Sequence, residues 1–221
     1  MSFLPALPAL GEKPPISLLE MTRLVAEGDG HTAKSVVEAL SLESWLAEQS
    51  LKLCLADAAN PVQIEAPVGL TIPEKISRCL NADLGHEGEA VWLTELWRAY
   101  YDHLEQLGKR TGSRLLVRWA TWERALREQL ARVRVTTPVE TEPSDVDHRA
   151  LLENWKTASD PMIAERVLDE GRWRFIEEEI KAYSFECDEF TAYMLKLRLL
   201  TRYASFDRAG GLKILEEVTI P

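Results

Sequence analysis

Apolar residues recur every three or four positions along most of the chain, and this spacing predicts amphipathic helices. The clearest case is the segment 113–135, where the members of one apolar stripe are four, three, four, four and three positions apart. These members are Leu115, Trp119, Trp122, Leu126, Leu130 and Val133. We expect this stripe to be buried, so that Trp119 and Trp122 belong to the core and do not contact a ligand.

The same period predicts helices elsewhere in the chain. They lie at residues 17–27, 32–58, 73–80, 86–107, 147–158, 161–183 and 185–205, with a last short segment at 212–218. Val62 and Ile64 alternate with polar residues, which leaves a short strand as the alternative there, although a lone strand has nothing to pair with. The sequence therefore predicts an all-α multi-helix bundle of about seven to eight helices.

Residues 136–146 have two prolines and no apolar periodicity, so we predict a linker there. It separates an N-terminal helical region, 1–135, from a C-terminal helical region, 147–221. Two helix starts have recognisable caps. Ser17 is followed three positions later by Glu20, which predicts a capping box, and Asp160 precedes Pro161 at a helix start.

The composition is that of a globular protein, with 46% apolar and 28% charged residues. A net charge of −10 argues against nucleic acid as a partner. Cys54, Cys79 and Cys187 are odd in number and far apart, so we expect reduced thiols in a cytoplasmic protein. The N-terminus has no basic leader, and no apolar stretch approaches the length of about 20 residues that spans a bilayer.

Candidate chemistry is sparse, and we expect no catalytic, cofactor-binding or metal-binding residues. Two Asp-x-x-His pairs, Asp83 with His86 and Asp145 with His148, lack partner carboxylates for a di-metal site. The segment 108–112 is rich in glycine but joins two predicted helices, so a helix–helix turn fits it better than a phosphate loop. His103 falls on an apolar helix face, where a hydrogen-bonded core histidine is the more common role than a general base.

Charge is distributed unevenly. Residues 109–134 hold eight basic residues against two acids, a local charge of +6, whereas residues 169–189 hold eight acids against three basic residues. Either these segments pair within the fold or face water, or the arginines bind an acidic partner. The candidate partner-binding residues are Arg114, Arg118, Arg124 and Arg127.

A helical wheel separates these four arginines. Arg124 lies opposite the apolar stripe and should face water or a partner. Arg118 and Arg127 flank the stripe on different sides and are placed to meet acids of the segment 169–189, with Arg114 somewhat further round.

Both ends of the chain and its central helix carry motifs of a known family. At the C-terminus they are Arg172-Trp173, Ser184-Phe185, Asp188, Ala192-Tyr193, Lys196, Arg202-Tyr203, Phe206-Asp207 and Gly211. At the N-terminus they are Leu7 to Leu10 and Lys13 to Ser17, and in the central helix they are Arg114, Trp119, Trp122-Glu123 and Leu126-Arg127. These residues resemble a bacterial family of V-type ATP synthase proteins that are similar to the C subunit of V/A-type ATPases (the d subunit in eukaryotes). Phe206 and Glu128 stand where the family has Leu and Asn.

The resemblance implies a helical fold like that of the C subunit and a non-catalytic role, in which the chain links the central rotor shaft to the membrane ion-translocating ring. The partners would be those components of the ATPase, and the chain would be cytoplasmic and peripheral to the inner membrane through the complex. Two alternatives stay open. One is a helical adaptor or scaffold unrelated to the ATPase, and the other is an all-helical enzyme, which a buried cluster of His103 with carboxylates would favour.

We predict that the isolated protein neither binds nor hydrolyses ATP, because no segment of the sequence has the pattern of a phosphate-binding loop. Isothermal titration calorimetry with ATP and Mg²⁺ should give no saturable heat. Saturable binding in the micromolar range would contradict the prediction.

Overall fold

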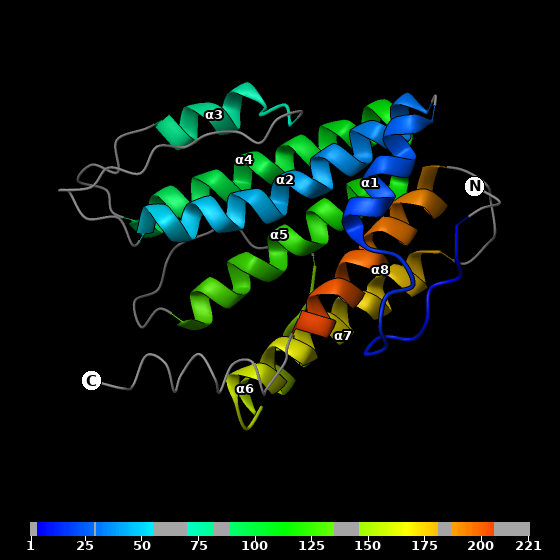
Figure 1. Cartoon of the computed structure of the whole chain (residues 1–221). Helices are drawn as coiled ribbons and strands as arrows, with labels where there is room; N and C mark the ends of the chain where they lie inside the picture. The colour runs from blue at the N-terminus through cyan, green and yellow to red at the C-terminus, as the bar shows by residue number, and fades with distance from the viewer. Residues whose placement is uncertain are drawn as a thin grey trace, which may run out of the picture. The chain divides into compact units, whose positions relative to one another are not determined.

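The computed structural model describes residues 4–28, 30–54, 70–81, 89–134, 146–180 and 187–205. Within these ranges the chain forms eight helices, α1 to α8, and no strand (Figure 1). The predicted all-α class is confirmed.

The described helices belong to two compact units. Unit 1 comprises Met1–Glu27 and Asp147–Pro221, and unit 2 comprises Gly28–Val146. The predicted boundary after residue 146 matches this division, but the predicted N-terminal region 1–135 does not, because residues 1–27 group with the C-terminal helices. The two units are described separately below.

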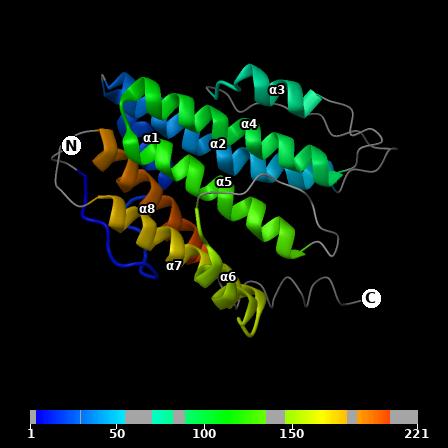
Figure 2. The same ribbon diagram turned by 180° about the vertical axis from the view of Figure 1, so that it is seen from behind.

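Unit 2 is built around α4. Its helices are α2 (His31–Cys54), α3 (Glu74–Asn81), α4 (Glu89–Thr111) and α5 (Arg114–Arg134). The other three all pack on α4, and α5 does so most extensively (Figures 1 and 2). The fully buried residues at the centre of the unit include Val36, Leu40, Leu46, Ile76, Leu96, Tyr100, Leu104, Leu116 and Leu126.

The apolar stripe of α5 is buried over most of its length. Leu115, Trp119, Leu126 and Leu130 are all buried, as predicted. Trp122 is half-buried and stacks on Trp119 with a distance of 5.9 Å between ring centroids. Val133 is a correction to the prediction, because it is 39% exposed. It lies in the last turn of α5, where the apolar period continues but the burial does not.

The turn between α4 and α5 is tight. A Cβ atom at Gly108 would lie 2.7 Å from Cγ2 of Val117 and 2.9 Å from its backbone nitrogen, so the helices meet where no side chain fits. Gly112 has φ +76°, a conformation that favours glycine. The Ser113 hydroxyl accepts from the amide of Leu116 at 3.1 Å and caps α5. The predicted helix–helix connection is therefore present, but it consists of Gly112 and Ser113 alone, because residues 108–111 form the last turn of α4.

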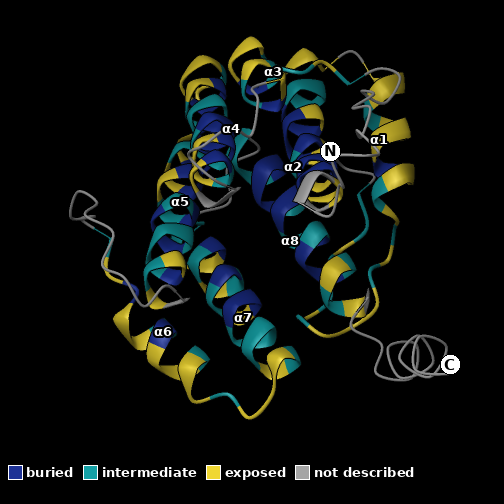
Figure 3. Ribbon diagram, turned by 90° about the vertical axis from the view of Figure 1, so that its left-hand side faces the viewer, coloured by how far each residue is buried: buried dark blue, intermediate teal, exposed yellow. Residues whose placement is uncertain are grey.

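Unit 1 consists of α1 (Leu18–Glu27), α6 (Arg149–Lys156), α7 (Pro161–Glu179) and α8 (Cys187–Ser205). Helix α7 packs against both α6 and α8, and α1 packs on α8. The buried positions of α7 lie on one side of the helix, whereas those of α8 occur all round its middle part (Figure 3). Gly171 permits the close approach of α6, because a Cβ atom there would lie 2.7 Å from a methyl carbon of Leu151.

Both predicted caps of unit 1 are confirmed. The Ser17 amide and hydroxyl donate to the Glu20 carboxylate at 3.0 and 2.7 Å, and the Ser17 hydroxyl accepts from the Glu20 amide at 3.1 Å. The hydrogen bond from the Ser17 amide holds the pKa of Glu20 below its usual value. Asp160 accepts from the amide of Ile163 at 2.8 Å, with Pro161 as the first helical residue.

The N-terminal arm explains why residues 1–27 belong to unit 1. Residues 4–17 form no helix, and Gly11 has φ +99°. A Cβ atom on Gly11 would lie 3.4 Å from the ring of Tyr203 in α8. The guanidinium carbon of Arg166 is 5.1 Å from the centroid of the same ring. The Tyr203 ring thus contacts the arm and α7 together.

Three predicted segments lie outside the described residues. They are the alternative strand at Val62 and Ile64, residues 136–145 of the linker, and the last short helix at 212–218.

We predict that Gly108→Ala destabilises the protein by about 1–3 kcal/mol, because the added methyl group overlaps backbone as well as side-chain atoms of α5. Gly30→Ala is the matched control, since its Cβ atom would lie 3.5 Å from Ala33 in ordinary contact. Thermal denaturation of both variants checks this. Equal melting temperatures would show that α4 and α5 separate at no cost.

Candidate functional site

The four candidate arginines of α5 fall into two pairs. Arg114 and Arg118 are exposed, whereas Arg124 and Arg127 are half-buried. Buried Leu116, Ala120 and Glu123 widen the buried face of α5 beyond the apolar stripe, on the side toward Arg124 and Arg127. The arginine-rich helix is therefore not one continuous basic surface.

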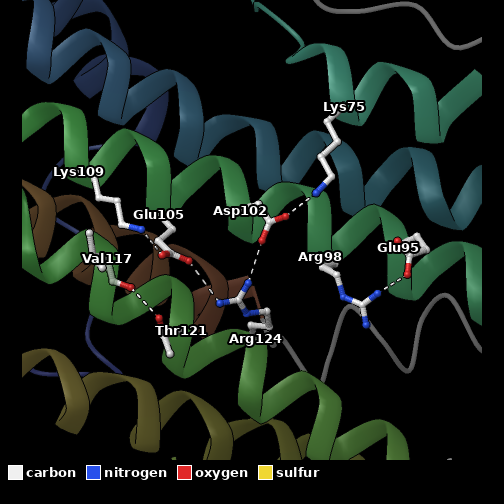
Figure 4. A network of polar contacts seen from close by, with 9 residues as sticks. All are labelled: Lys75, Glu95, Arg98, Asp102, Glu105, Lys109, Val117, Thr121 and Arg124. Atoms are coloured by element: carbon white, nitrogen blue, oxygen red, sulfur yellow. Dashed lines mark hydrogen bonds and ion pairs between the residues drawn. The ribbon is translucent and has the colours of Figure 1, made fainter. Parts of the chain in front are cut away.

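Arg124 corrects the prediction that it faces water or a partner. Its guanidinium donates to Asp102 at 2.9 Å and to Glu105 at 3.4 Å, both on α4 (Figure 4). Lys75 of α3 also donates to Asp102, at 2.5 Å, and Lys109 donates to Glu105 at 2.6 Å. Arg124 and the two acids are each about a quarter exposed, so this network joins α3, α4 and α5 at the edge of the unit 2 core.

Arg127 is one-third exposed and lies over an aromatic ring. Its guanidinium carbon is 4.0 Å from the Trp97 centroid, a cation–π geometry. It donates to Glu43 of α2 at 3.4 Å, and its Nε atom is 3.6 Å from Glu123. The Tyr100 hydroxyl donates to Glu43 at 3.1 Å. Arg127 therefore meets carboxylates within the fold, as predicted, but these belong to unit 2, and pairing with acids of the segment 169–189 stays a prediction.

His103 is half-buried near the end of α4. Burial lowers its pKa, and the charge of Arg110, two turns further along the helix, lowers it again. An arginine is thus the charged group that acts on His103. A histidine in this environment favours the neutral form and suits a core position.

In unit 1, buried Asp169 and Arg172 of α7 form an ion-pair cluster with Arg202 of α8, which is exposed. Asp169 is 0% exposed and accepts from Arg172 at 2.9 Å, and its Oδ1 atom is 3.5 Å from Arg202 of α8. Glu165, one turn earlier on α7, accepts from Arg202 as well. Burial raises the pKa of Asp169, while Arg202 and Arg172 oppose that rise.

Three further described residues of the C-terminal resemblance, Trp173, Lys196 and Tyr203, also make packing contacts. Lys196 lies 4.6 Å from the Trp173 centroid and donates to Glu177 at 3.1 Å, and Trp173 donates to the same carboxylate at 2.9 Å. Tyr203 receives the N-terminal arm. The resembling residues therefore tie α7 to α8, and α8 to the arm.

The remaining sequence candidates are dispersed. His148 is buried as the cap residue of α6, whereas Asp83, His86 and Asp145 lie outside the described residues. Where the chain is described, no three His, Cys, Asp or Glu side chains gather as a metal site would require, and no helix has the length and apolarity to cross a membrane. A shallow hollow beside α1 has Glu20 on its wall, whose carboxylate already caps that helix.

Sequence reasoning missed the acids that bind the arginines. Asp102 and Glu105 are three apart on α4 and so share a face, a signal visible in the sequence. Glu43 gives no such signal, because its pairing with Arg127 depends on how α2 and α5 meet around α4.

Comparison with known proteins gives one finding. Residues 147–219 match a family described as "Protein of unknown function (DUF2764)". The search of curated proteins and the search of solved structures find no match. The matched residues include the Asp169–Arg172–Arg202 cluster.

We predict that Arg124→Glu lowers stability by about 1–2 kcal/mol, because it replaces two ion pairs by repulsion from Asp102 and Glu105. Arg114→Glu has the same charge change at an exposed position and should leave the melting temperature nearly unchanged. Thermal melts at low salt measure both. If Arg124→Glu melts like Arg114→Glu, the α4–α5 network contributes nothing to stability.

Proposed function

We propose that this chain is a non-catalytic component of a bacterial V/A-type ATPase, linking the central rotor shaft to the membrane ion-translocating ring. The proposal starts from the resemblance at the two ends of the sequence. The observation that carries it is that these ends meet in unit 1, where Gly11 of the arm contacts Tyr203 of α8. The resembling segments at the two ends thus belong to a single folded part, whereas those of the central helix lie in unit 2.

The ion pairs that join neighbouring helices suit a protein component that transmits force. Arg202 of α8 forms an ion pair with the buried Asp169 of α7, and Arg124 links α5 to α4 in the same way. Closely packed helices resist bending, because protein interiors are as dense as organic crystals. A coupling component needs this stiffness together with surfaces that match its neighbours.

The partners in this proposal are the central shaft and the membrane rotor ring. Nucleic acid is not among them, given the net charge of −10. The chain would be cytoplasmic and would reach the inner membrane only through the complex.

A second candidate is a helical adaptor or scaffold unrelated to the ATPase. It is favoured by Arg110 and Arg114, which are exposed and make no ion pair with a described residue. Such residues suit docking on an acidic protein of any kind.

We predict that the tagged full-length chain, expressed in a bacterium that encodes it, co-purifies with shaft and ring proteins of a V/A-type ATPase. Mass spectrometry of the affinity-purified material identifies them, and an unrelated tagged acidic helical protein serves as the control. Recovery of another stable complex without any ATPase component would replace this proposal by the adaptor.

A further inference from the structure

The end of the α4–α5 hairpin has an excess of positive charge that no acid among the described residues neutralises. Lys109, Arg110 and Arg114 are exposed here, within one short stretch of chain. Lys109 pairs with Glu105, but neither Arg110 nor Arg114 has a hydrogen bond or ion pair in the part of the chain that the structure describes. We call these three residues the basic corner.

The nearby acids of the hairpin are already engaged. Asp102 binds Lys75 and Arg124, and Glu105 binds Lys109 and Arg124. The charges of Arg110 and Arg114 are therefore available to a partner. The influence of Arg110 on His103 shows that its charge acts on its surroundings.

The backbone that presents the basic corner is fixed. Gly108 and Val117 bring α4 and α5 into close contact, and Ser113 caps α5. The Thr111 hydroxyl donates to the Leu107 carbonyl at 2.9 Å and closes the last turn of α4. A rigid scaffold reduces the entropy lost when charged side chains bind.

We propose that the basic corner is the docking site for an acidic segment of a protein partner. Arg110 and Arg114 are four residues apart, so their Cα atoms lie within about 14 Å, a span that one acidic helix or loop covers. An extended polyanion would meet the repulsion of a chain with net charge −10, whereas a short acidic segment touches the corner alone.

This inference deepens the proposed function and rests on its partner-binding role, with the contact at Arg110 and Arg114. Arg110 and Arg114 thus replace Arg124 and Arg127 as the predicted partner-binding residues, because Arg124 and Arg127 form ion pairs inside unit 2. Lysine at the two positions would keep the charge, and glutamate would reverse it.

The test uses the full-length chain, with hexaglutamate as the probe, in an NMR titration at low salt. Binding should shift the amide signals of residues 108–116 and should fade near 0.2 M salt, where the screening length is below about 10 Å. Arg110→Glu/Arg114→Glu should weaken binding about tenfold, since each exposed pair contributes roughly 0.2–1 kcal/mol and reversal adds repulsion.

Two further variants serve as controls. Lys13→Glu/Arg174→Glu changes the net charge equally at exposed positions of unit 1 and should leave binding within about twofold, because neither residue belongs to the basic corner. Arg110→Lys/Arg114→Lys should keep most of the affinity. All three should melt close to the unchanged protein. A large loss of melting temperature in Arg110→Glu/Arg114→Glu alone would show that the corner serves the fold, and would overturn the proposal.

Three other results would overturn it. They are equal weakening by both glutamate variants, shifts that map away from residues 108–116, and tighter binding of an oligothymidylate of equal charge. The same variants, used in the co-purification experiment, distinguish a failure of the proposed docking site from a failure of the proposed ATPase role. If Arg110→Glu/Arg114→Glu still recovers the shaft and ring proteins in full, the proposed function stands and the corner is not the contact. If the unchanged chain recovers no ATPase component yet binds hexaglutamate through the corner, the corner stands and the ATPase role fails.

Discussion

The close approach of α4 and α5 at Gly108 is the constraint on which unit 2 depends. No side chain fits between Gly108 and Val117, so the two helices are fixed in register from their connecting turn onward. That register sets Arg124 opposite Asp102 and Glu105, and it sets Arg127 over Trp97. The absence of a side chain at Gly108 thus determines which charged residues of α5 form ion pairs within unit 2.

In unit 1 a glycine again allows two helices to approach closely, and an ion-pair cluster joins a third helix to them. Gly171 admits Leu151 of α6 on one side of α7, and the Asp169 cluster holds α8. Burying Asp169 raises its pKa, and the two arginines compensate for the lost hydration. Removal of either arginine would leave Asp169 with less compensation for its burial, and all three residues lie within the segment 147–219 that matches the family.

The ability of the α4–α5 hairpin to bind a partner depends on which of its charged side chains form no ion pair with a described residue. The helical wheel placed Arg124 toward water or a partner, yet the acids of α4 and α2 form ion pairs with Arg124 and Arg127 within unit 2. What remains is concentrated at the turn, on Arg110 and Arg114. Docking through such a corner would add specificity and speed of association more than affinity.

The sequence by itself determined the helices, the Ser17 and Asp160 caps and most of the apolar stripe of α5, because these depend on neighbours within one turn. Only the tertiary structure decided the rest. A helical wheel places each residue relative to the apolar stripe of its own helix. It could not show that contact with α4 extends the buried face of α5 as far as Arg124. Nor could it bring Gly11 to Tyr203, since that contact joins residues nearly a whole chain apart and depends on how α1 and α7 pack on α8.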